Sequence, residues 1–102
     1  MTRIGDETVN SFDHGRTSGI GTTAVSLTGA AVKATKGVQV RAADSNTATV
    51  YVGNANLTTD SNDATDGFPL KAGEALFVPV NDAAKIFVAS TTTNQKVFWF
   101  AI

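Results

Sequence analysis

Apolar and polar residues alternate along several short stretches of the chain, as they do in β-strands that bury one face. The alternation predicts strands over residues 22–28, 75–80, 85–89 and 95–102, with polar turns between them. Pro79 cannot donate a backbone hydrogen bond, so that part of its strand should lie at a sheet edge or a bulge. Residues 29–36 lack the N-cap and apolar stripe of a helix, and we expect a strand edge or a connection there.

Two further alternating runs, residues 38–42 and 47–53, are separated by the turn-forming residues Asp44, Ser45 and Asn46. Two such runs joined by a short polar turn predict a β-hairpin. The inward positions of this hairpin would be Val38, Val40, Val50 and Val52.

The two ends of the chain differ from this pattern. Residues 1–21 contain four glycines and scattered large apolar residues, which predicts an extended N-terminal arm. The arm is either a disordered terminus or a strap that docks on a neighbouring subunit. Residues 97–102 are apolar on both strand faces, so one face needs a cover from a second sheet, the arm or a symmetry mate.

Strands with turns every eight to twelve residues and no strong helix predict an all-β fold. We expect an antiparallel β-sandwich or a jelly-roll-like barrel over residues 22–102, preceded by the arm. The pattern does not distinguish a sandwich from a barrel.

Charge and composition exclude several classes of partner. Eight basic and nine acidic residues give a net charge of −1, so no strong field favours nucleic acid or an anionic membrane. The absence of cysteine excludes disulfides and thiolate metal sites. No apolar run among the first thirty residues is long enough for a signal peptide, so we expect none.

Candidate catalytic chemistry is sparse, and we predict no enzyme and no cofactor. The single histidine, His14, has no cysteine available, and a nucleophilic triad would need partners from far along the chain. The two glutamates, Glu7 and Glu74, fall in the arm and in a turn, which does not suit paired acid and base catalysis.

Residues 54–67 form a polar loop that carries Asp60, Asp63 and Asp66, oxygen ligands of the kind calcium prefers. The spacing departs from an EF-hand, because the loop positions for glycine and bidentate glutamate are not both filled. A solvated acidic turn is therefore favoured over a calcium site. The sequon Asn56-Leu57-Thr58 is expected to be coincidental without a secretory signal.

Four short motifs within residues 36–102 resemble small β-domains of tailed-bacteriophage virion proteins, such as capsid decoration (cement) proteins, head fibres and some tail proteins. They are Gly37 to Arg41, Val50-Tyr51-Val52-Gly53, Gly67-Phe68-Pro69-Leu70 and Gly73-Glu74. The resemblance implies a β-sandwich or jelly roll, often trimeric, that sits on the major capsid protein and bridges neighbouring capsomers. It implies no catalytic residue.

The expected function is that of a capsid decoration protein on the outer surface of the virion, a homotrimer that binds the major capsid protein and stabilises the shell. The alternative is a host-recognition or carbohydrate-binding module of a tail or head fibre, which would use the 54–67 loop and Tyr51. A small self-assembling enzyme fragment is the third possibility. The expected interface residues are Arg3, Ile4, Val9, Phe12, His14, Arg16, Ile20, Phe98, Phe100 and Ile102.

Overall fold

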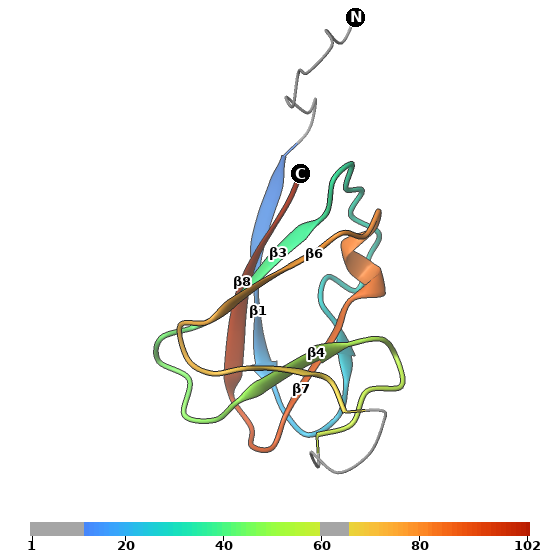
Figure 1. The fold of residues 1–102 in the computed structure, drawn as a ribbon. Helices are drawn as coiled ribbons and strands as arrows, with labels where there is room; N and C mark the ends of the chain where they lie inside the picture. Colours follow the sequence, from blue (N-terminus) through green and yellow to red (C-terminus); the bar gives the residue numbers. More distant parts are fainter. Residues whose placement is uncertain (1–11, 60–65) are drawn as a thin grey trace, which may run out of the picture.

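Two four-stranded antiparallel sheets make up the computed structural model, which describes residues 12–59 and 66–102 (Figure 1). Sheet A has the order β1 (Asp13–Ile20), β8 (Gln95–Ala101), β3 (Val38–Ala42), β6 (Ala75–Val78). Sheet B has the order β2 (Val25–Ser26), β7 (Phe87–Ser90), β4 (Val50–Gly53), β5 (Phe68–Leu70). The predicted all-β fold is confirmed, and of the two architectures that the pattern left open it is the sandwich.

The core lies between the two sheets and is built from the inward positions of alternating strands. Sheet A contributes Val38, Val40 and Val97, and sheet B contributes Val50 and Val88, all fully buried. These branched side chains suit strands because they pack well on a pleated surface. The prediction that the valines at 38, 40, 50 and 52 face inward is confirmed.

The predicted hairpin between β3 and β4 is wrong, because the two strands belong to different sheets. The segment between them does turn, with the Asn46 backbone amide donating to the Ala43 carbonyl at 3.1 Å, but β8 holds this turn and β4 does not fold back on β3. The Asn46 amide nitrogen donates to the Lys96 carbonyl at 2.8 Å, and its oxygen accepts from the Lys96 amide at 2.9 Å. The buried Gln95 side chain accepts from the Thr47 and Ala48 amides. The chain therefore crosses from sheet A to sheet B.

The second half of the predicted arm is a strand. Asp13–Ile20 pairs with β8 as the edge strand β1, so the sandwich includes residues that the sequence pattern assigned to the arm. The inward positions of β1 before its irregularity are Asp13, Gly15 and Thr17, so an edge strand forms without apolar alternation. Residues 1–11 lie outside the described residues.

The remaining elements follow the sequence closely. The strand expected at 22–28 is reduced to β2, and the strand expected at 75–80 ends at Val78 on the edge of sheet A, where Pro79 follows. A short 3₁₀ helix, η1 (Ala83–Lys85), precedes β7. In the part of the chain that the structure describes, no helix is long and apolar enough to cross a bilayer.

Asp82 ties the 29–36 connection to η1. Its carboxylate accepts from the Ala84 amide at 2.9 Å and the Val32 amide at 3.0 Å, and it caps the helix. These two hydrogen bonds lower the pKa of Asp82, assisted by nearby Lys85 and opposed by partial burial.

The Asp82 carboxylate should stabilise the fold at neutral pH and lose this effect in acid. A pKa that is lower in the folded chain gives stability that is present above the unfolded pKa of about 3.8 and is lost as pH falls through the folded pKa. We expect the wild type to lose its stability advantage over Asp82→Asn as the pH falls below the ordinary pKa of an aspartate, about 3.8. Urea unfolding of both proteins across this range measures the difference, and a constant difference would contradict the role of the charge.

Candidate protein-binding face

The outward positions of sheet A line up across its four strands in two rows. One row places His14 of β1 beside Phe100 of β8, Gln39 of β3 and Phe77 of β6. The next row places Arg16 beside Phe98, Arg41 and Ala75. We call these two rows, together with Phe12, the outer face of sheet A. Directly opposed residues on neighbouring strands lie about 5 Å apart, so the rows form one continuous surface.

This surface is unusually aromatic for an exposed sheet face. Phe12, Phe77 and Phe98 are 61%, 42% and 45% exposed, and Phe100 is partly buried beneath the stacked ring of Phe12, with ring centroids 5.7 Å apart. The outer face surrounds an apolar hollow of about 390 Å³, whose lining includes Phe12, Phe98 and Phe100. Contiguous exposed aromatic surface of this kind marks interaction sites.

Two glycines let the neighbouring aromatic rings lie close to the backbone. A Cβ atom on Gly37 would come within 2.6 Å of the Phe77 ring, and one on Gly15 within 2.7 Å of the Trp99 ring. Trp99 takes an inward position of β8 and packs against the core. The last strand therefore divides its aromatics, with Trp99 inward and Phe98 and Phe100 outward.

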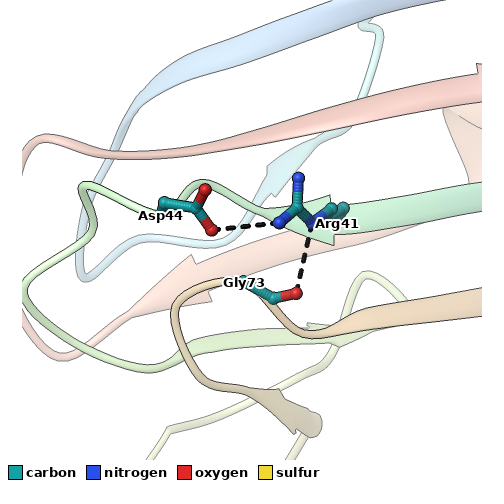
Figure 2. A network of polar contacts seen from close by, with 3 residues as sticks. All are labelled: Arg41, Asp44 and Gly73. Atoms are coloured by element: carbon teal, nitrogen blue, oxygen red, sulfur yellow. Dashed lines mark hydrogen bonds and ion pairs between the residues drawn. The ribbon is translucent and has the colours of Figure 1, made fainter.

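The polar groups of this face are mainly basic. Arg41 is held by two contacts, from Nε to the Gly73 carbonyl at 3.2 Å and from a terminal nitrogen to the Asp44 carboxylate at 3.0 Å (Figure 2). Arg16 and His14 extend from β1, and no strand of sheet A places an acidic residue on this face.

The structure brings together five of the residues expected at an interface: Phe12, His14, Arg16, Phe98 and Phe100. Ile20 is fully buried and belongs to the core. A register shift between Thr17 and Ile20, with Gly19 at φ +68°, rotates Ile20 from the outward to the inward side.

The other expected interface residues lie elsewhere. Ile102 is half-buried, and its carbonyl accepts hydrogen bonds from the amides of residues 35–37 beside β3. Arg3, Ile4 and Val9 lie outside the described residues.

The outer face also includes Gln39, Arg41 and Phe77, which are not among the residues expected at an interface. Phe77 carried a usable signal, because Leu76, Phe77 and Val78 are apolar at three consecutive positions and one of them must point away from the core. Gln39 and Arg41 were assigned correctly to the outward side of their strand. Their place beside Phe98 depends on the pairing of β3 with β8, which the sequence pattern did not indicate.

The polar loop offers a second, smaller hollow of about 250 Å³, lined in part by Asn54, Asn56, Asp66 and Phe68. The Asp66 carboxylate accepts a hydrogen bond from the Thr58 hydroxyl at 2.8 Å. Asp60 and Asp63 lie outside the described residues. Within residues 12–59 and 66–102, no three His, Asp or Glu side chains gather as a metal site would require. Tyr51 of β4 is half-buried and is not among the residues that line this hollow.

The outer face of sheet A thus combines an apolar hollow with a basic border. Comparison of the chain with models of protein families, with curated proteins and with solved structures finds no match.

Proposed function

We propose that the protein is a non-enzymatic structural protein of a phage virion, a capsid decoration protein that binds the major capsid protein through the outer face of sheet A. The observation that supports the proposal is the exposed aromatic surface of Phe12 and Phe98, which line the hollow, together with exposed Phe77 on the same face. A decoration protein acts by burying surface against the shell, and exposed aromatic groups contribute most to such contacts.

The position of the face supports the proposal further. It lies on the opposite side of sheet A from the core, so a partner can cover it without disturbing the packing between the sheets. The resemblance to phage virion domains favours the major capsid protein as this partner and a homotrimer as the assembled form. The outer capsid surface is the corresponding location.

A host-recognition or carbohydrate-binding module is the second candidate. The hollow beside the polar loop favours it, because Phe68 is 56% exposed next to Asn54 and Asn56. An aromatic ring flanked by amide groups is suited to a sugar ring and its hydroxyl groups. This site lies on sheet B. A test that compares substitution of Phe98 on sheet A with substitution of Phe68 on sheet B therefore distinguishes the two functions.

Phe98→Asp should weaken binding to capsids, because it removes an aromatic ring from the centre of the face and replaces it with a strongly hydrated carboxylate beside Arg16 and Arg41. We expect the dissociation constant for undecorated capsids of the encoding phage to rise at least about 30-fold, equivalent to about 2 kcal/mol. Sedimentation of capsids mixed with purified protein measures it. The matched control is Phe68→Asp, at a similarly exposed phenylalanine of sheet B.

Retention of full binding by Phe98→Asp, with loss of binding by Phe68→Asp, would contradict the proposal and favour the loop site. Circular dichroism and thermal unfolding of both variants check that neither substitution unfolds the sandwich. Both side chains point away from the core, so both variants should fold.

A further inference from the structure

The two sheets have four edge strands, β1 and β6 in sheet A and β2 and β5 in sheet B. An edge strand presents unpaired amide and carbonyl groups that can pair with a strand of another molecule. Three of these edges are poor templates for such pairing. β2 has only two residues, and the chain's two prolines lie within β5, as Pro69, and directly after β6, as Pro79.

Pro79 stands where an amide would point out of sheet A. In an antiparallel ladder, successive residues point their backbone groups alternately toward one side of the strand and the other. The Ala42 amide donates to the Glu74 carbonyl at 2.9 Å, so Glu74, Leu76 and Val78 point their backbone groups toward β3. Pro79 therefore faces the free edge, where it provides no donor.

Pro69 stands in the same position on sheet B. The Ser90 amide donates to the Gly21 carbonyl, away from β4, so its neighbour Ala89 faces Tyr51 of β4. Tyr51 therefore points its backbone groups toward β7, and Pro69, opposite Tyr51 on β5, faces the free edge. Both prolines thus block an edge without removing a hydrogen bond from either sheet.

β1 is the longest edge strand, with eight residues, and it contains neither proline nor lysine. At the end of β8, Gly37 and Ile102 exchange two hydrogen bonds of 3.0 and 3.1 Å. The even-numbered residues of β8 therefore face β3, and its odd-numbered residues face β1. The β1 residues opposite those odd-numbered positions are 13, 15 and 17.

The backbone groups of His14 and Arg16 consequently point away from the sheet. Within residues 12–59 and 66–102, no group bonds to the backbone amide or carbonyl of either residue. The free edge of β1 is therefore a strand template with its donors and acceptors in place.

A second copy of the chain is the occupant that the four edges favour. Proline on an edge prevents pairing with other molecules, and copies of the same chain could otherwise pair at every edge. Two usable edges would let copies join in an open row, whereas one usable edge closes the association at a pair. The blocked edges and the single free one are therefore suited to a chain that pairs through β1 alone.

The regular part of β1 favours one register for this pair. Residues 13–17 precede the irregularity, and Gly15 lies at their centre. A two-fold axis at Gly15 pairs all five residues, and His14 of each copy then exchanges two hydrogen bonds with Arg16 of the other. Gly15 has no side chain where the strands come closest, with Cα atoms about 4.5 Å apart. An axis at Arg16 would instead oppose two arginine side chains.

We propose that two copies pair antiparallel through the free edges of β1, about a two-fold axis at Gly15, and so join their A sheets into one continuous sheet. This contact goes beyond the proposed function, because it uses the edge of sheet A and leaves the outer face uncovered. Both outer faces lie on the same side of the joined sheet, since directly paired residues point to the same side. In the proposed homotrimer, the contact would join one trimer to another.

Removal of one outward amide tests the pair in the full-length protein without capsids. Arg16→Pro removes two hydrogen bonds from the pair, one in each copy. We expect its dissociation constant to rise at least about 30-fold, equivalent to about 2 kcal/mol. Arg16→Ala is the matched control, because it removes the same side chain but keeps the amide. By sedimentation equilibrium, the wild type and Arg16→Ala should have twice the mass of Arg16→Pro at the same concentration.

Equal masses for Arg16→Pro and the wild type would overturn the inference, as would a wild type that is a monomer or a single trimer. Circular dichroism checks that both variants fold. Failure of the proposed function is read separately from Phe98→Asp, which lies on the outer face and should keep the wild-type mass. Loss of capsid binding by Phe98→Asp with equal masses for Arg16→Pro and the wild type would leave only the proposed function standing.

Amide hydrogen exchange of the wild type tests the same contact without a substitution. At high protein concentration, the amides of His14 and Arg16 should exchange at least about ten-fold more slowly than at low concentration. The amides of Ala75 and Phe77, which point out of the free edge of β6, are the internal control and should be unaffected. Slower exchange at Ala75 and Phe77, with no change at His14 and Arg16, would overturn the inference.

Discussion

Replacing Gly37 with alanine is expected to lower the free energy of unfolding by about 3 kcal/mol. Gly37 has φ +154°, a backbone conformation that residues with a Cβ atom rarely adopt. The added Cβ would lie 2.5 Å from the Val78 carbonyl oxygen, a backbone atom of β6 that cannot rotate away. It would also press on the Phe77 ring at 2.6 Å. Urea unfolding followed by Trp99 fluorescence measures the loss.

Gly29→Ala is the matched control for this prediction. Gly29 also has a positive φ, +71°, but an added Cβ would meet no atom within 4 Å. Its replacement should therefore cost about 1 kcal/mol, from the backbone conformation alone. Equal losses at the two positions would contradict the close packing of β6 and the Phe77 ring against Gly37.

Ile20→Ala should lower the free energy of unfolding by about 3 kcal/mol, within the roughly 2–5 kcal/mol range for removing a buried isoleucine side chain. Ile20 is fully buried where β1 meets the core, so its truncation leaves a cavity between the sheets. The loss should be independent of protein concentration because the contact lies within one chain. Chemical unfolding at two widely separated concentrations measures both properties.

Val25→Ala provides the comparison, because Val25 is 40% exposed on β2 and its truncation should cost less than about 1 kcal/mol. An Ile20→Ala variant that keeps the stability of the wild-type monomer but fails to associate would contradict the core position of Ile20. It would support the place at a subunit interface that the sequence pattern predicts.

The sequence pattern predicted which side of a strand faces the core better than it predicted which strands pair. Alternation assigned Val38 and Val40 inward, and Gln39 and Arg41 outward, because burial of one face imposes a period of two. The wrong prediction that β4 pairs with β3 relied on the turn at Asn46, a residue typical of turns. Its backbone amide does close a turn onto Ala43, but its side-chain amide pairs with the Lys96 backbone, a contact fifty residues away that local patterning does not reveal.

The candidate face was partly predictable for the same reasons. The apolar run at 97–102 indicated that a second face of the last strand needs a cover, and Phe98 and Phe100 do point outward. The position of Ile20 was not predictable from alternation, because the irregularity beside Gly19 shifts the period by one residue. Edge strand β1 lacked apolar alternation and so resembled an arm.

The central claim, that the outer face of sheet A is buried when the protein binds the shell, is tested most directly by labelling a single thiol. The chain contains no cysteine, so Ala75→Cys places a unique thiol on the outer face, and Ala55→Cys places one in the polar loop. Both alanines are exposed, so both thiols should react with maleimide at similar rates in the free protein. On capsids, we predict that labelling slows at least about ten-fold at position 75 and stays unchanged at position 55. Protection at position 55 with unchanged labelling at position 75 would contradict the account.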